Sequence, residues 1–169
     1  MIDYFQKFKH KLFLVKNKSN RSSKFKYNYL NKKFIIFGGG TGFGYEIAKH
    51  IFRHGGDIIL ISKNKEKLKK ARNNILLNKK YKNNIFIYNF NLLNFENYSI
   101  LFKKLKKKFK SIDFIFQCAA LPEKNNYFPL LTSTNKYMKN SIKLNFLSNV
   151  YLFRNFIKFF EIKKKTRFV

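Results

Sequence analysis

The sequence predicts an α/β fold built on a doubly wound parallel sheet, and three observations support this prediction. Short, almost wholly apolar runs are typical of strands that are buried on both faces of a parallel sheet. Segments with helical periodicity separate these runs, as in βαβ units. Five of the seven glycines lie in one heptad directly after the first run. The apolar runs are residues 34–37, 58–61, 85–90 and 112–116.

The composition indicates one folded domain. The chain has 169 residues, enough for a single core. Its hydrophobic share of 45% and aromatic share of 19% argue against disorder, despite a net charge of +29. The single cysteine, Cys118, excludes an internal disulfide framework and a cysteine-based structural zinc site, and no metal is expected. No apolar run approaches the roughly 18 residues that a membrane span needs.

The positive charge has two interpretations. Of the 37 basic residues only five are Arg, and Asn occurs 21 times and Phe 22 times. A joint excess of Lys, Asn and Phe is what A+T-rich codons supply, so drift in codon usage is favoured. The other interpretation is a surface that binds RNA. In both cases we expect association with polyanions at low salt that weakens steeply as salt rises.

Residues 1–32 are predicted to form a basic extension, and the domain is expected to occupy residues 33–169. Apolar residues at helical spacing, with lysines nearby, predict a short amphipathic helix that a polar linker over residues 16–32 follows. Such a segment is typical of a leader to a mitochondrion or plastid, or of an anchor at a membrane surface. The other interpretation is a basic extension without a targeting signal, on a cytoplasmic protein. The apolar residues are Phe5, Phe8, Leu12 and Val15.

A glycine-rich turn separates the first predicted strand, residues 34–37, from the first predicted helix. The turn reads Gly-Gly-Gly-Thr-Gly-Phe-Gly over residues 38–44, and the helix is expected to end at His54-Gly55-Gly56. A strand that turns sharply into a helix directs free backbone N–H groups at an anion. Side chains at Gly38, Gly42 or Gly44 would block the turn, the approach of a pyrophosphate, or the packing of helix on strand. The sequence therefore predicts dinucleotide binding.

The spacing Gly38-x-x-x-Gly42-x-Gly44 resembles the cofactor loop of the short-chain dehydrogenase/reductase family, and the loop variant is closest to that of the 2,4-dienoyl-CoA reductases. The resemblance implies a Rossmann-type sheet with strand order 3-2-1-4-5-6-7, of which this chain would supply 3-2-1-4 and the start of 5. Phe37 departs from the family, which usually carries Thr there. The loop residues to which the resemblance gives cofactor contacts are Gly38, Gly40, Thr41, Gly42, Phe43 and Gly44.

The later strands keep the same order of motifs. Lys63 follows the second strand, where an acid would bind the ribose of NAD, so NADP is favoured over NAD. By resemblance, Asn91 and Leu92 match the Asp-Val or Asp-Leu pair that contacts adenine. Residues 117–120, Gln-Cys-Ala-Ala, resemble the family's Asn-Asn-Ala-Gly motif beside the cofactor ribose, with Gln117 and Cys118 in place of the two Asn. The resemblance places Cys118, Ala119 and Ala120 at the cofactor. No His is in register with Cys118, so we expect an inert, buried thiol there.

Two helices, from about residue 65 to 77 and through residues 98–105, are expected between these strands. A loop around Pro122 and Pro129 is expected to precede a long helix over residues 133–160. Asn145 in this helix matches the family's active-site Asn, which helps to hold the water of a proton relay. The predicted apolar stripe of the helix is Leu147, Val150, Phe153, Phe156, Ile157 and Phe160.

Residues 167–169, Arg-Phe-Val, are predicted to begin the fifth strand. In the family that strand leads to the catalytic Ser and a Tyr-x-x-x-Lys pair, and none of the three is present here. We therefore expect a truncated, NADP(H)-binding portion of an oxidoreductase that is inactive alone. A missing C-terminal half, or another protein chain, is expected to cover strand 4 and helix 133–160. The alternative is a non-catalytic basic remnant that binds RNA or protein in a larger assembly.

Overall fold

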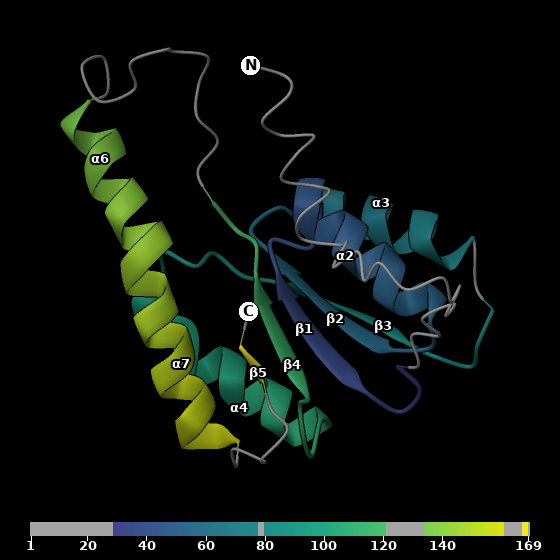
Figure 1. The fold of residues 1–169 in the computed structure, drawn as a ribbon. Coiled ribbons are helices and arrows are strands. Elements are labelled where there is room, and N and C mark those ends of the chain that lie inside the picture. Colours follow the sequence, from purple (N-terminus) through teal and green to yellow (C-terminus); the bar gives the residue numbers. More distant parts are fainter. Residues whose placement is uncertain (1–28, 78–79, 121–133, 161–166, 169) are drawn as a thin grey trace, which may run out of the picture.

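The computed structural model describes residues 29–77, 80–120, 134–160 and 167–168, and these form a five-stranded parallel sheet (Figure 1). The strand order is β3-β2-β1-β4-β5. This order confirms the predicted Rossmann-type fold class, including the start of a fifth strand. The strands are β1 (Lys33–Phe37), β2 (Asp57–Ser62), β3 (Ile85–Asn89), β4 (Phe114–Gln117) and β5 (Arg167–Phe168).

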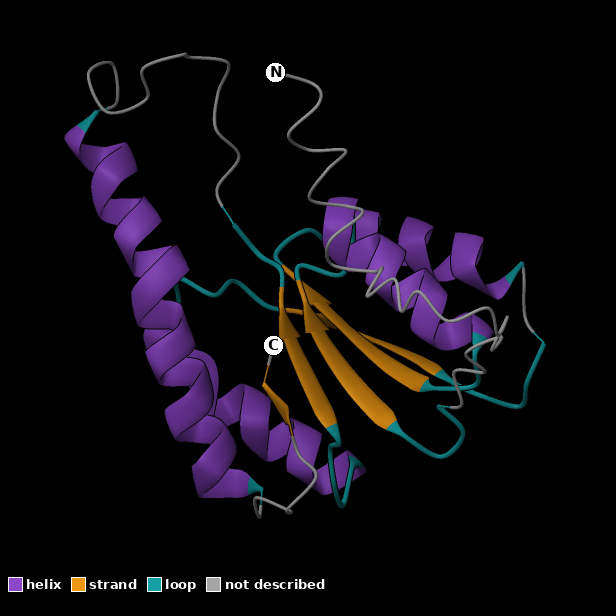
Figure 2. Ribbon diagram, viewed as in Figure 1, coloured by secondary structure: helices purple, strands orange, loops and turns teal. Residues whose placement is uncertain are grey.

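Helices cover both faces of the sheet (Figure 2). Helices α2 (Gly42–Arg53) and α3 (Lys65–Leu76) pack on one face. Helices α4 (Tyr98–Lys108) and α7 (Ser148–Phe159) pack on the other. A 3-10 turn, η1 (Phe95–Asn97), precedes α4, and a π-helical turn, η2 (Lys143–Leu147), joins α6 (Asn135–Ile142) to α7. In β1 and β2 successive side chains enter opposite cores, because strand side chains alternate between faces.

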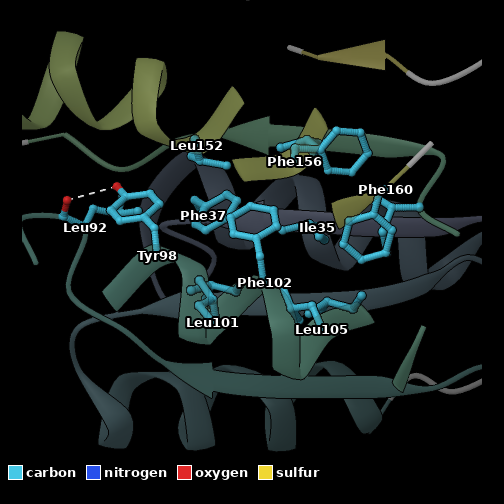
Figure 3. Close-up of a cluster of buried hydrophobic side chains, with 14 of the residues drawn as sticks. Ile35, Phe37, Leu92, Tyr98, Leu101, Phe102, Leu105, Leu152, Phe156 and Phe160 are labelled. Atoms are coloured by element: carbon cyan, nitrogen blue, oxygen red, sulfur yellow. Dashed lines mark hydrogen bonds between the residues drawn. The ribbon is translucent and has the colours of Figure 1, made fainter. Parts of the chain in front are cut away.

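The core under α4 and α7 is rich in aromatic rings (Figure 3). Phe102 of α4 is fully buried, with its ring centroid 6.5 Å from that of Phe156 and 6.4 Å from that of Phe160. The hydroxyl of buried Tyr98 donates a hydrogen bond of 2.9 Å to the carbonyl oxygen of Leu92. The core on this face therefore extends to the end of β3, where the adenine-contacting pair is predicted.

The long helix differs from its prediction in two respects. Residues 143–147 form a π turn, so the unit over residues 135–159 is not one regular α-helix. The predicted apolar stripe also divides between two faces, because Phe156 and Phe160 are buried whereas Val150, Phe153 and Ile157 are 48%, 47% and 45% exposed. The face that packs on the sheet is a row at four-residue spacing. Its members are Leu144, Ser148, Leu152, Phe156 and Phe160.

The stripe divides because the helix carries two apolar rows. Both fit helical periodicity, and periodicity does not say which row faces a sheet. Ser148 belongs to the buried row, which made that row look interrupted in the sequence. Among the described residues, no helix has the length and apolar character to cross a membrane. The predicted extension up to residue 28 and the loop around Pro122 and Pro129 lie outside the described residues.

Candidate functional site

The carboxyl ends of the parallel strands bring the predicted site segments to one edge of the sheet. Phe37, the last residue of β1, pairs with Ile61 of β2 and with Gln117 of β4. Past the strand ends, the Gly38 N–H donates to the carbonyl oxygen of Ile61 at 2.8 Å, and the Cys118 N–H donates to that of Phe37 at 2.9 Å. The glycine turn therefore lies at the centre of this edge, where open α/β sheets bind ligands.

Gly38 and Gly44 are held by close backbone contacts. Gly38 has a positive φ of 77°, and a Cβ there would lie 2.6 Å from the backbone nitrogen of Ala119. A Cβ on Gly44 would lie 2.6 Å from the Gly38 carbonyl oxygen and 3.1 Å from the Cβ of Cys118. Since neither backbone neighbour can yield cheaply, both positions exclude any side chain. These two glycines set how closely α2 packs against β1 and β4.

Gly42 is held by a different constraint. Its φ is 59°, which L side chains rarely adopt, yet a Cβ there would meet no atom within 4 Å. Its neighbour Phe43 is 60% exposed, and no acidic residue lies in the first turn of α2. The amino end of α2 therefore opens onto unfilled space at Gly42, with N–H groups that favour an anion.

The glycine turn also contacts the first turn of α3. A Cβ on Gly40 would lie 3.5 Å from the Cβ of Lys67. Lys63 is exposed between Ser62, which ends β2, and Asn64, whose side chain accepts from the Lys67 N–H at 2.9 Å and caps α3. The first acidic residue along the chain after β2 is Glu66, whose carboxylate lies 3.3 Å from the Lys69 ammonium. No carboxylate therefore ends β2, as the sequence predicted.

Asn91 and Leu92 follow β3 at the same edge. The Phe90 N–H donates to the carbonyl oxygen of Ser62 at 3.0 Å, which ties this segment to the end of β2. The side-chain oxygen of Asn91 accepts from the Leu93 N–H at 3.1 Å, so it already closes a local turn. An amide oxygen has two lone pairs, and one acceptor site is left for a ligand.

The segment after β4 consists of small residues, and one of them, Cys118, has a thiol with a raised pKa. Burial raises the pKa of the Cys118 thiol to about 11, so the thiol is protonated at neutral pH. This supports the inert part of the prediction, but Cys118 is half-buried rather than buried. Gln117 turns its side chain back to the chain, and its Oε1 accepts from the Ala119 N–H at 3.2 Å. Ala120 is exposed at the end of this segment.

Asn145 lies in the π turn and is exposed. Its side-chain amide donates to the hydroxyl of Ser141 at 3.1 Å. One turn further on, the fully buried Ser148 donates to the carbonyl oxygen of Leu144 and accepts from the Gln117 Nε2 at 3.4 Å. Single π turns in α-helices frequently occur at functional sites. The Gln117–Ser148 contact links this turn to the end of β4.

Sequence reasoning missed this link. Gln117 was noted only as a departure from the Asn-Asn-Ala-Gly motif, and Ser148 was not singled out. A signal was available, because Ser148 is the one polar member of the four-residue row on the buried face of the helix. A buried polar side chain in an apolar row needs a hydrogen-bond partner, and here the partner comes from β4.

Among the described residues, no group of three His, Cys, Asp or Glu is placed to bind a metal ion. A parallel sheet in the order 3-2-1-4-5, with a glycine turn at the carboxyl end of its first strand, defines a Rossmann-type α/β domain. The chain belongs to the short chain dehydrogenase family, whose model matches residues 32–169. No curated protein matches the sequence.

Solved structures support the same fold. A short-chain type dehydrogenase/reductase from Mycobacterium ulcerans aligns with a TM-score of 0.69 at 15% identity, over 79% of this chain and 48% of that one. A putative short chain dehydrogenase from Escherichia coli CFT073, complexed with NADPH, aligns with a TM-score of 0.68 at 19% identity, over 79% and 55%. One from Shigella flexneri 2a str. 301, complexed with NADP, aligns with a TM-score of 0.67 at 21% identity, over 78% and 55%.

The chain thus spans about half the length of these three proteins. At these identities the likeness shows the fold alone. The closer relation to 2,4-dienoyl-CoA reductases stays a prediction.

Proposed function

We propose that this chain binds NADP(H) at the carboxyl edge of its sheet, as the nucleotide-binding part of an oxidoreductase. The observation that carries the proposal is the open space at Gly42, at the amino end of a helix without acidic residues in its first turn. A pyrophosphate needs the open space because it must approach the backbone closely. It needs a helix end without acidic side chains because it must accept N–H hydrogen bonds there. Two similar structures contain NADPH or NADP, which supports the choice of ligand.

Each predicted site residue has a role in this proposal. The backbone of residues 38–44 would hold the pyrophosphate, and Lys63 would face the 2′-phosphate that distinguishes NADP from NAD. Asn91 and Leu92 would flank the adenine. The small residues 118–120 would let the dinucleotide pass over the end of β4. The bound nicotinamide ring would supply the hydride chemistry.

Asn145 would take part in the proton transfer of such a reaction. Its exposed amide lies on the π turn, and Ser148, the residue after that turn, is hydrogen-bonded to Gln117 at the end of β4. We assign it the task of holding a water for proton transfer. We propose only the class of the reaction, namely oxidation or reduction with a nicotinamide cofactor, and name no substrate.

Titration of the full chain with NADPH and with NADH, followed by cofactor fluorescence at about 0.15 M salt, tests the proposal. We expect NADPH to bind at least about tenfold more tightly than NADH, which is about 1.4 kcal/mol. Because a chain of charge +29 attracts any polyanion, inorganic tripolyphosphate is the control competitor. Displacement of NADPH by an equal concentration of tripolyphosphate would show a purely electrostatic association and would refute a built nucleotide site.

RNA binding is a second candidate function, and the outer face of α4 is the observation that favours it. Exposed lysines at 103, 104, 106, 107 and 108 lie on this helix, although Lys106 and Lys108 also lie over the rings of Phe160 and Phe86. A salt titration of poly(U) binding separates the two functions. A basic surface gives a steep loss of affinity with salt, whereas NADPH binding at a built site persists.

A further inference from the structure

Two of the chain's three histidines lie at the carboxyl end of α2, His50 in its last turn and His54 at its C-cap. Residues four positions apart on a helix lie on the same face. The two imidazole rings accordingly lie close together, with their centroids 4.4 Å apart and their planes tilted by 39°. Two histidines at this spacing are an arrangement with which a helix binds a metal ion.

The His54 ring is held in a tautomer that suits a metal ligand. Its Nδ1 lies 2.8 Å from the backbone carbonyl oxygen of His50, and because a carbonyl oxygen can only accept, Nδ1 carries the proton. In the neutral ring the lone pair is then on Nε2. Metal-binding histidines almost always donate their other ring N–H in this way, which fixes both the tautomer and the orientation of the ring.

The separation of the two rings fits one shared ion. Bonds between a metal and an imidazole nitrogen are about 2.0–2.1 Å long, so one ion bridges nitrogens that lie up to about 4 Å apart. The ring of Tyr29 packs edge-on near both imidazoles, with its centroid 6.2 Å from that of His50 and 6.1 Å from that of His54. The Tyr29 backbone N–H also donates to the carbonyl oxygen of His54 at 3.1 Å. The segment before β1 therefore packs against the pair and restricts how far the two rings can move apart.

The charges around the pair come from the end of the helix and from neighbouring side chains. The carboxyl end of a helix carries a partial negative charge, which favours a cation at His54. Arg53 opposes a cation, but its side chain is exposed, so water screens the repulsion. The carboxylate of Glu46 lies 3.0 Å from the Lys49 ammonium, and no group of three His, Cys, Asp or Glu forms in the described part of the chain. An ion at this position would therefore have two protein nitrogens and take its other ligands from water.

We propose that His50 and His54 chelate a divalent late transition-metal ion of the class of Cu²⁺, Ni²⁺ and Zn²⁺. Imidazole nitrogens suit these ions, whereas Mg²⁺ and Ca²⁺ prefer oxygen ligands. The expectation of no metal depended on the cysteine content, which does not report a pair of histidines. Because the pair is aligned only when α2 is folded, the bound ion would stabilise the fold. The site is at the far end of α2 from the glycine turn, about 18 Å along the helix, and does not depend on nucleotide binding.

Titration of the full chain with ZnCl₂ in a calorimeter tests the proposal at about pH 7.5, where an ordinary imidazole is neutral. We expect one Zn²⁺ per chain, and binding that is weaker by at least about tenfold in His50→Gln and in His54→Gln. Circular dichroism shows whether each variant keeps its fold. The matched control His54→Gln/Lys104→His keeps three histidines but moves one to an exposed position on α4, and it should lose binding as well. His10→Gln should keep the affinity of the wild-type chain.

Thermal unfolding gives a second measurement. Zn²⁺ at about ten times its dissociation constant should raise the Tm of the wild-type chain by at least about 2 °C, and it should leave the Tm of His54→Gln unchanged. MgCl₂ at the same concentration should have no effect on the wild-type chain. Equal Zn²⁺ affinity of the wild-type chain and both glutamine variants would overturn the proposal. So would full affinity in His54→Gln/Lys104→His, since unpaired surface histidines would then suffice, or sedimentation of two chains per Zn²⁺, since the ion would then be shared between chains.

Discussion

Replacing Gly42 by alanine separates the glycine turn's part in binding from its part in folding. The added methyl group meets no atom within 4 Å, so the only cost to the folded chain is the backbone conformation at φ 59°. That conformation costs an L residue about 1–2 kcal/mol. A domain of this size should then lose about 2–8 °C in Tm and stay folded at room temperature.

Nucleotide affinity should fall in addition to stability. The methyl group occupies the space through which a pyrophosphate would approach the N–H groups of α2. We expect Gly42→Ala to weaken NADPH binding by at least about tenfold, or about 1.4 kcal/mol, when cofactor fluorescence is titrated with the full chain. Thermal unfolding followed by circular dichroism gives the matching stability.

Gly55→Ala is the control for backbone strain. Gly55 has a φ of 92° at the other end of α2, remote from the carboxyl edge of the sheet. A Cβ there meets the flexible side chain of Leu30 at 2.7 Å, so this variant should lose at least as much stability. It should keep the NADPH affinity of the wild-type chain. Unchanged affinity in a folded Gly42→Ala variant, or an equal loss in Gly55→Ala, would refute the reasoning.

Four further predictions follow from the same structure. Lys63→Gln should weaken NADPH binding by about five- to tenfold and leave NADH binding unchanged in the same titration, since a favourable charge at the 2′-phosphate is lost; an equal effect on both would contradict its assignment. Gln117→Leu should lower the free energy of unfolding by about 1–3 kcal/mol in urea, because the Ala119 N–H and the Ser148 hydroxyl lose a partner, and an unchanged urea midpoint would count against the link. Phe102→Ala should cost about 3–5 kcal/mol by the same measurement, whereas Ile100→Ala on the exposed side of α4 should change stability by less than about 0.5 kcal/mol. Alkylation of Cys118 by iodoacetamide should reach half its maximal rate near pH 11 in the folded chain but near pH 9.0 in the unfolded chain. Because the folded-state pKa is the higher one, the thiol binds more protons when folded, and its contribution to stability falls as pH rises through that window.

Much of the fold followed from the sequence because buried parallel strands have a simple pattern. The observed bounds of β1, β2 and β3 differ from the predicted runs by no more than one residue at either end. The turn between β1 and α2 was also predictable, because strand, glycines and helix occur in order in one unit. The order of strands was implied by family resemblance rather than by periodicity, which says nothing of which strands are neighbours.

The candidate site was less accessible to sequence reasoning. The structure shows that the loop glycines meet different constraints: Gly38 and Gly44 lie in close backbone contacts, whereas a Cβ at Gly42 would face open space. Their spacing in the sequence does not report this difference. The helix over residues 135–159 was placed correctly, but the sequence did not separate its buried row from its exposed row, because both apolar rows fit the period. The link between Gln117 and Ser148 joins residues 31 positions apart, and no local pattern reports such a pair.

The close meeting of Gly38, Gly44 and Cys118 limits how this molecule can change in evolution or in the laboratory. A side chain at position 44 would press on the carbonyl oxygen of Gly38 and on the Cβ of Cys118 at once. Position 44 can therefore vary only if the ends of β1 and β4 both draw back from α2. Grafting the loop over residues 38–44 onto another scaffold would require the acceptor to supply an equally slender strand end in place of Cys118 and Ala119.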